Sequence, residues 1–285
     1  MRARWLPAPL GGFIGAAGRG RVLAAFARSA YLEVRGEVVA LAAAGLDRGP
    51  LVILVDGFDG GRLSPGDEVA LAGGRLRVAA YDIALDGADP WDPTLPTPPA
   101  GAVSRLPDVE RALARGAPPE SAAALLGHPP AAVSARHRRL LDSLCAGLAV
   151  LEDTLRGLDA CGDLAAAVGH IAGRGPGLTP SGDDVLVGVL HAMTAWPALA
   201  AAAGGPEVRR RIARAASPLT TRISAAYLRA ASEGWAAEPW HTLVGALDGT
   251  DEALGAAVAA LLRVGETSGA DALTGFCWAA RRLGA

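Results

Sequence analysis

The chain has 285 residues, of which 51% are hydrophobic and 20% are charged, and its formal net charge is −2. This composition is typical of a globular protein with one large domain or two ordinary ones. The near-neutral charge, and the lack of a zinc-finger, helix-turn-helix or aromatic–basic motif, argue against nucleic acid as a partner.

The N-terminal segment MRARWLPAPLGGFIGAAGRGRV (1–22) has arginines ahead of a weakly apolar stretch. Glycines and prolines interrupt that stretch, and it is too short to span a membrane. The cysteines, Cys145, Cys161 and Cys277, are odd in number and scattered, which agrees with a reducing compartment. We therefore expect a soluble, cytoplasmic protein with no membrane segment.

The first hundred residues have the pattern of β structure. The segment AYLEVRGEVVALAA (30–43) resembles a hairpin around Gly36, and GPLVILVDG (49–57) is an apolar run between glycines. LSPGDEVALAGGRLRVAAYDIAL (63–85) contains two strands separated by a Gly73-Gly74 turn. Short strands at about ten-residue spacing predict a small barrel-like or sandwich-like domain over residues 1–100.

The stretch DGADPWDPTLPTPPAG (86–101) contains five prolines. Proline lacks the backbone N–H that a ladder or helix needs, so the stretch is interpreted as a linker or extended strap without regular structure. We place the end of the β domain in this linker, near residue 100.

From Leu106 onward the apolar spacing becomes helical, with short connections rich in Gly, Pro, Asp and Ser. The pattern predicts an all-α domain over residues 101–285 and an α+β fold overall. The predicted helices cover residues 107–115, 119–126, 130–157, 162–173, 183–196, 206–216, 221–233, 239–247, 251–264 and 270–283.

Two segments of the helical part share a pattern. SGDDVLVGV (181–189) and SGADALTGF (268–276) both read S-G-x-D-x-L-x-G followed by an apolar residue, and a predicted helix ending at glycine precedes each. Repeated units of this kind often pack about a local twofold axis. We therefore expect the two turns to lie close together and their polar residues to line one cavity.

Each turn also has a purely structural interpretation. Ser followed three residues later by Asp is a capping box, so Ser181 with Asp184, and Ser268 with Asp271, could serve only to start helices. The first turn holds more polar groups than capping needs, since Thr179 and Asp183 accompany Ser181 and Asp184. Its glycines, Gly177 among them, also allow the backbone to approach a ligand. These features favour a binding site.

A third segment, SPLTTRISAAYL (217–228), places Thr220, Thr221, Arg222 and Ser224 around a helix start. Hydroxyls, backbone N–H groups and a guanidinium together suit an anion, although Arg222 could equally form an interhelical ion pair. The chain has no lysine, so a cationic anchor must be arginine or a helix N-terminus. Asp183 and Asp184 would repel an anion unless arginine or Mg²⁺ mediates, and the two aspartates are candidate Mg²⁺ ligands.

The three segments GRGPGLTPSGDDVLVGVL, TTRISAAYLRAASEG and VGETSGADALTGF resemble, in order, the motif blocks of the AllH-like family. One branch of that family is a subunit of oxamate carbamoyltransferase in allantoin degradation. The resemblance implies a share in carbamoyl transfer between oxalurate and phosphate, giving oxamate and carbamoyl phosphate. It also implies companion subunits in a hetero-oligomer.

The resemblance directs attention to particular residues of this sequence. We expect Asp183, Asp184, Arg222 and Asp271 to take part in the chemistry. The residues expected to bind substrate are Gly177, Thr179, Ser181, Gly182, Thr220, Thr221, Ser224, Thr267, Ser268 and Gly269. Carbamoyl transfer needs neutralised phosphate charge and a polarised carbonyl oxygen, which arginine and helix N-termini can supply.

Three functions stay open from the sequence. The first is a transferase subunit acting on a small anionic amide, with phosphate, carbamoyl phosphate or oxamate as ligand. The second is an Mg²⁺-dependent enzyme acting on a small phosphorylated or carboxylate substrate. The third is a non-catalytic assembly subunit of such a complex.

Overall fold

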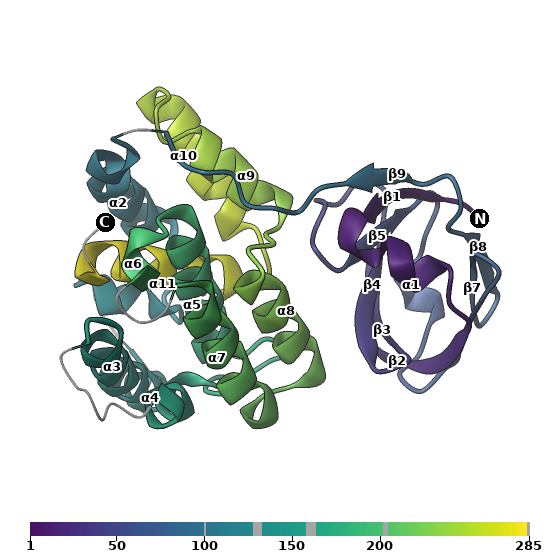
Figure 1. Ribbon diagram of the computed structural model, residues 1–285, viewed down its shortest axis with the longest axis horizontal. Helices are drawn as coiled ribbons and strands as arrows, with labels where there is room; N and C mark the ends of the chain where they lie inside the picture. The colour runs from purple at the N-terminus through teal and green to yellow at the C-terminus, as the bar shows by residue number, and fades with distance from the viewer. Residues whose placement is uncertain (100, 128–132, 158–163, 202–204, 284–285) are drawn as a thin grey trace. The chain divides into compact units, whose positions relative to one another are not determined.

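The structure is a computed structural model that describes residues 1–99, 101–127, 133–157, 164–201 and 205–283. The chain divides into two compact units (Figure 1). The first consists of residues 1–94 with residues 236–238, and the second of residues 95–235 with residues 239–285. The first unit is built from strands and the second from helices, which confirms the expected α+β class.

Residues 3–91 form one curled sheet of nine strands, in the order β8-β7-β6-β2-β3-β4-β5-β1-β9. Most neighbours are antiparallel, whereas β4 with β5 and β1 with β9 are parallel. The strands are β1 (Ala3–Pro7), β2 (Gly18–Phe26), β3 (Ser29–Val34), β4 (Glu37–Ala43), β5 (Val52–Val55), β6 (Glu68–Ala72), β7 (Arg75–Val78), β8 (Tyr81–Ala84) and β9 (Asp89–Trp91).

Two-residue turns set the register of the hairpins expected from the sequence. Val34 pairs with Glu37 across Arg35 and Gly36, which both have positive φ. Ala72 likewise pairs with Arg75 across Gly73 and Gly74, again with positive φ at both positions. Turns with two left-handed residues match the twist of the flanking strands, which explains why glycines stand here.

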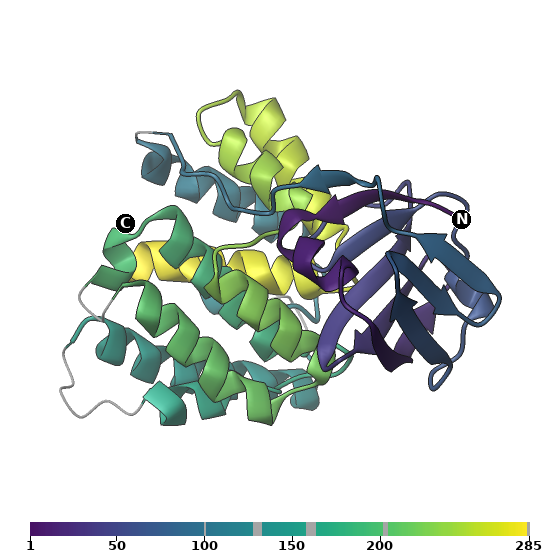
Figure 2. The same cartoon turned by 45° about the vertical axis from the view of Figure 1, so that its right-hand side comes forward.

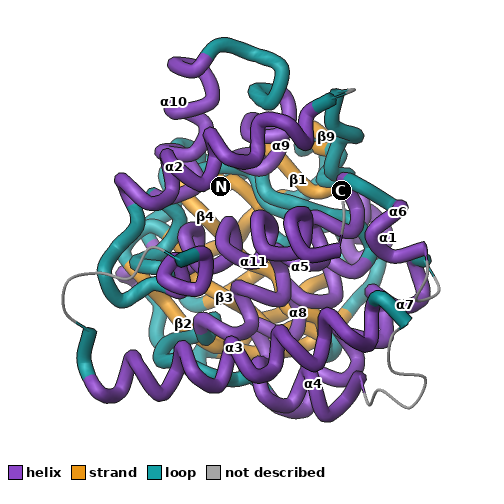
Figure 3. Tube along the Cα trace, turned by 90° about the vertical axis from the view of Figure 1, so that its left-hand side faces the viewer, coloured by secondary structure: helices purple, strands orange, loops and turns teal. Residues whose placement is uncertain are grey.

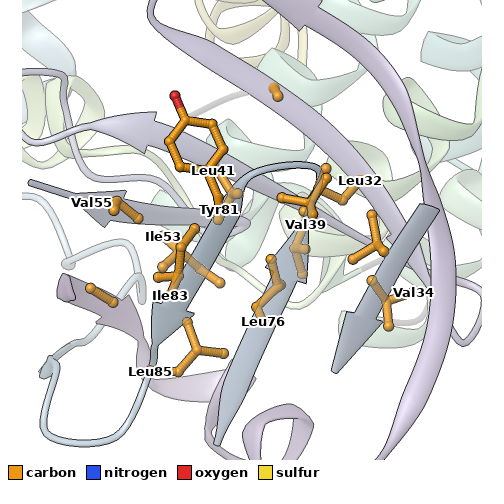
Figure 4. Close-up of a cluster of buried hydrophobic side chains, with 14 of the residues drawn as sticks. Leu32, Val34, Val39, Leu41, Ile53, Val55, Leu76, Tyr81, Ile83 and Leu85 are labelled. Carbon is orange, nitrogen blue, oxygen red and sulfur yellow. The ribbon is translucent and has the colours of Figure 1, made fainter. Parts of the chain in front are cut away.

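Alternate residues of the strands fill the interior of the curled sheet. Leu32, Val39, Ile53, Leu76 and Ile83 are fully buried. Figure 4 shows these side chains, from five different strands, projecting into a common hydrophobic cluster. The period-two alternation of buried and exposed residues in β6 and β7 is what a sheet with one covered face requires.

The sequence interpretation of this unit is wrong at one place. Strands β1 and β2 lie within the first 26 residues, in agreement with a β domain over residues 1–100, although the sequence marked no individual strand there. The error is in the proline-rich stretch, which contains a strand, since β9 pairs in parallel with β1. Pro90 is tolerated there because β9 lies at the edge of the sheet, where one side of the strand needs no ladder bonds.

The second unit is helical. Among its described residues the α-helices are α2 (Leu106–Gly116), α3 (Ala135–Leu155), α4 (Leu164–Ile171), α5 (Ser181–Ala195), α6 (Ala198–Ala201), α7 (Pro206–Ala216), α8 (Arg222–Ser232), α9 (Glu238–Gly245), α10 (Asp251–Leu262) and α11 (Ser268–Leu283). No helix in the described parts of the chain combines the length and apolarity that crossing a membrane needs.

Several helix predictions need correction. Only a 3₁₀ turn, η4 (Ala122–Leu126), forms within the expected helix 119–126. Helix α5 begins at Ser181 and α11 at Ser268, each two residues earlier than expected, so both motif serines are helical. The expected helix starts at 130 and 162 lie outside the described residues. Helix α6 and the short α1 (Gly11–Ile14) were not anticipated.

Helices α5 and α11 pack against each other along the centre of the helical unit. They lie side by side in Figure 3, and Figure 2 shows α11, in yellow, among the other helices of its unit. Both are buried on nearly all sides, from Ser181 to Ala195 and from Gly269 to Ala280. A helix buried all round belongs to the core of its domain, so the repeated motif forms the centre of this unit.

Candidate functional site

The two motif repeats form equivalent structures of unequal turn length. In each, a helix ends at a positive-φ glycine turn and a buried helix begins with Ser-Gly, as α4 leads to α5 and α10 to α11. The first turn reads GPGLTPS (175–181) and the second GETS (265–268), seven residues against four. The additional residues carry Thr179, Leu178 and Gly177, so the first turn is the more elaborate one.

Glycines make the helix packing equivalent in the two repeats. A Cβ at Gly182 would lie 1.9 Å from the carbonyl oxygen of Ile171, and one at Gly269 would lie 1.8 Å from that of Leu261. Only a residue without a side chain fits so close to a neighbouring backbone. The predicted binding residues Gly182 and Gly269 therefore have a demonstrable packing role.

The two turns meet, which confirms their expected adjacency. The hydroxyl oxygens of Thr179 and Ser268 lie 3.0 Å apart. A hydrogen bond from the Ser268 hydroxyl lowers the pKa of Asp184, and one from the Ser181 hydroxyl lowers the pKa of Asp271. Each motif aspartate thus faces the motif serine of the other repeat.

The capping-box interpretation of the first turn is wrong. Helix α5 begins at Ser181 itself, after Pro180, and no side chain caps it. The backbone N–H of Asp184 donates to the Pro180 carbonyl oxygen at 3.1 Å. Ser181 and Asp184 are therefore available to the opposite repeat.

Asp183 is a fully buried acceptor for three groups of the protein. The Gly173 N–H donates to its Oδ1 at 2.8 Å, and the Ser224 hydroxyl donates to its Oδ2 at 2.8 Å. The Thr220 hydroxyl donates to the same Oδ2. Burial raises the pKa of Asp183, while the Thr220, Gly173 and Ser224 donors oppose that rise. Asp183 therefore fixes the third segment to the first turn.

The third segment is joined to the first turn at a second point. Thr221 is the N-cap of α8, where its hydroxyl oxygen accepts the Ser224 N–H at 3.0 Å and its O–H donates to the Leu178 carbonyl at 2.5 Å. Arg222 follows as the first residue of α8 and is exposed. The structure thus brings all three motif blocks together, with Arg222 on the surface beside them.

Asp271 has a different environment from Asp183. It is fully buried, and its Oδ1 accepts the Ala122 N–H from η4 at 2.5 Å. Burial raises its pKa to about 6. The Ala122 N–H, the Thr267 and Ser181 hydroxyls and the charge of His137 all lower the pKa and so limit this rise. His137 is itself buried, with its Nδ1 3.4 Å from Glu120 Oε2. Nothing in the sequence indicated that Ala122 would donate to Asp271 or that His137 would affect its pKa.

Asp184 and Asp271 each retain an unpartnered oxygen. Within the described part of the chain, Oδ2 of each receives no hydrogen bond. Burial raises the pKa of Asp184 well above its ordinary value, the Asp271 and Asp183 charges add to the rise, and the Ser268 and Thr179 hydroxyls oppose it. Buried polar atoms without partners are uncommon in folded proteins, so these oxygens need an explanation.

Several backbone N–H groups that the sequence pattern suggested as anion ligands already donate hydrogen bonds within the protein. The N–H of Gly182 donates to Arg174 O, and that of Asp183 donates to Pro180 O, both at 2.8 Å. In the other repeat, the N–H of Gly269 and of Asp271 donate to the carbonyls of Val264 and Thr267. The start of these two helices consequently presents carboxyl and hydroxyl oxygens rather than a row of free amides.

The site offers few side chains that could ligate a metal ion. Across the described residues, no group of three or more His, Cys, Asp and Glu side chains is placed to hold one. Both oxygens of Asp183 already accept hydrogen bonds from the protein. The geometry therefore gives no support to Asp183 and Asp184 as joint Mg²⁺ ligands.

Residues 171–280 match a family model described as oxamate carbamoyltransferase subunit AllH. The match covers α5, α8 and most of α11, and so includes all three motif blocks. The resemblance drawn from the motifs is thus confirmed for this segment, whereas the β unit lies outside it. No solved structure was found to match the chain.

Proposed function

We propose that this chain is a subunit of an oxamate carbamoyltransferase-like enzyme that acts in the breakdown of allantoin. The reaction transfers a carbamoyl group from oxalurate to phosphate. The bond between the carbamoyl carbon and the oxamate nitrogen breaks, a carbon–oxygen bond to phosphate forms, and the nitrogen takes up a proton. The products are oxamate and carbamoyl phosphate.

One observation carries this proposal: the three blocks within the family match are joined by direct hydrogen bonds. Thr179 contacts Ser268, and Thr221 donates to the backbone of Leu178. Residues far apart in the sequence thereby surround one place with hydroxyls and carboxyls, and the exposed Arg222 begins α8 directly after Thr221. Such a set can bind a small polar molecule with an anionic end.

The proposed roles divide between two ends of the substrate. Arg222, at the start of α8, neutralises the carboxylate or phosphate, since guanidinium binds both in a forked geometry. Thr179, Ser268 and Asp184 contact the uncharged carbamoyl end. Asp183, Thr220, Thr221 and Ser224 hold the blocks in register and act as positioning residues.

The test is an assay of the full chain with its companion subunits, measuring phosphate release from carbamoyl phosphate in the presence of oxamate. Arg222→Ala should reduce kcat/KM by about tenfold to a hundredfold, the range for a lost charge-assisted hydrogen bond. Arg229→Ala, seven residues further along α8 and also exposed, is the matched control and should retain activity. Equal activity of both variants would contradict the proposed role of Arg222.

A non-catalytic assembly subunit is the second candidate, and the environment of Asp183 favours it. Both of its carboxyl oxygens accept hydrogen bonds from the fold, three in all. This candidate predicts that Arg222→Ala folds, assembles with its partners and leaves the activity of the complex unchanged. The same assay therefore separates the two functions.

A further inference from the structure

Thr179, Asp184 and Ser268 form a polar cluster where the starts of α5 and α11 meet, here called the cross-repeat cluster. The two hydroxyls are half-buried and lie 3.0 Å apart. Asp184 is only 8% exposed, and both hydroxyls form hydrogen bonds with its carboxyl that lower its pKa. The cluster therefore lies at the border between the interior of the helical unit and its surface.

The cluster offers an acceptor without a donor. Oδ2 of Asp184 receives no hydrogen bond from any residue that the structure describes. The backbone N–H groups of Asp183 and Asp184 donate to the Pro180 carbonyl and not to this oxygen. An unpartnered buried carboxyl oxygen is retained in a folded protein when a water or a ligand supplies the missing donor.

We propose that the cross-repeat cluster binds the H₂N–C(=O)– group of the substrate, with Asp184 Oδ2 accepting a hydrogen bond from the amino nitrogen. One of the two hydroxyls, of Thr179 or Ser268, donates to the carbonyl oxygen, while the other keeps its hydrogen bond to Asp184. This inference rests on the proposed function and identifies the part of the substrate that the cluster recognises. Oxamate, oxalurate and carbamoyl phosphate all carry this group, whereas phosphate does not.

The charges around the cluster favour an amide over an anion. The Asp271 and Asp183 carboxyls add to the rise in the pKa of Asp184 as like charges, so further negative charge at this place is unfavourable. A second carboxylate or phosphate placed at Oδ2 would be repelled, whereas an N–H group presents a positive end to it. A site built to hydrogen-bond an N–H discriminates strongly against an analogue that lacks it.

Oxamate and oxalate are the matched probes, because they have the same size and a shared carboxylate and differ by an amino group against an oxygen. Calorimetric titration of the full chain should show oxamate binding at least about tenfold more tightly than oxalate. Asp184→Asn should weaken oxamate binding by about tenfold to a hundredfold and change oxalate binding much less. Glu266→Gln, an exposed carboxyl in the second turn, is the control and should preserve the preference for oxamate.

The outcomes separate this inference from the proposed function. Equal binding of oxamate and oxalate, or oxamate binding unchanged by Asp184→Asn, overturns the amide site and leaves the proposed function standing. Failure of oxamate to bind, with an active assembled enzyme, also overturns the amide site alone. No binding and no activity with the companion subunits overturns both. If Asp184→Asn does not fold, Ser268→Ala should give the same loss of preference, and an unchanged preference there would overturn the site.

Discussion

Gly188 of α5 and Gly275 of α11 occupy equivalent positions in the two repeats, and each lies against the backbone of the other helix. A Cβ on Gly188 would stand 1.7 Å from the carbonyl oxygen of Ala272, and one on Gly275 would stand 2.0 Å from that of Val185. The last glycine of the S-G-x-D-x-L-x-G pattern thus sets how closely the helices approach. That approach brings the turns at their starts together.

Gly188→Ala should therefore destabilise the helical unit by about 3 kcal/mol, because the added methyl group meets backbone that cannot move aside. Gly255→Ala in α10, where a Cβ meets no atom within 4 Å, is the control and should raise stability by up to about 1 kcal/mol. Urea unfolding of both variants measures the difference. A Gly188 variant as stable as the native chain would contradict the close packing.

The repeated pattern in the sequence predicted this pairing of helices, and the meeting of Thr179 with Ser268 follows from it. The exchange of partners, with Asp184 facing Ser268 and Asp271 facing Ser181, could not be predicted. Local spacing suggested a capping box, because a sequence shows only neighbours along the chain. Tertiary packing overrides that local preference here.

Two other features of the structure could not be predicted from the sequence, one at the site and one in the β unit. Asp271 accepts the N–H of Ala122, and any residue except proline supplies such a donor. In the β unit, Gly18 and Gly20 at the start of β2 hid the strand, since glycine is depleted in strands. A Cβ on Gly20 would lie 1.7 Å from the Glu33 carbonyl, so close backbone approach explains the glycine.

Asp183 should matter more for stability than for catalysis. Asp183→Asn weakens the acceptor for Gly173, Thr220 and Ser224, and we expect a loss of about 2 kcal/mol in the free energy of unfolding. Asp142→Asn, on the exposed side of α3, should change stability by less than about 0.5 kcal/mol. Guanidinium unfolding followed by circular dichroism makes the comparison, and equal stabilities would refute the role of Asp183.

His191 should make the fold sensitive to acid. It is fully buried against the Trp240 ring, with ring centroids 4.8 Å apart, and burial, with a contribution from His241, lowers its pKa to about 3. The unfolded chain takes up this proton near pH 6.5 and the folded chain does not, so stability is present above that pH and falls below it. Relative to His191→Phe, the native chain should lose about 2 kcal/mol between pH 7 and pH 5. Parallel pH profiles of the two proteins would argue against a buried neutral imidazole.

Asp271 should have the opposite pH dependence. Because its pKa is raised to about 6, the ionised buried carboxyl destabilises the fold above that pH, and the penalty disappears as pH falls from 6 toward 3.8. Asp271→Asn keeps an acceptor for the Ala122 N–H and removes the charge. The variant should be more stable than the native chain at pH 7.5, by up to about 3 kcal/mol, and lose this advantage near pH 4. Thermal unfolding at the two pH values tests it, and a variant less stable at pH 7.5 would show that the charge is needed.

If the meeting of the two repeats forms the binding site, a reversible cross-link between the two turns should control binding. Thr179→Cys and Ser268→Cys are combined in a chain whose Cys145, Cys161 and Cys277 are replaced by alanine. Hydroxyls 3.0 Å apart place the two sulfurs within reach of a disulfide. Mass spectrometry and oxamate titration should show that oxidation joins them, that binding is lost, and that reduction restores it. Two thiols that stay free would show that the turns do not meet, and a disulfide that leaves oxamate binding unchanged would show that oxamate binds elsewhere.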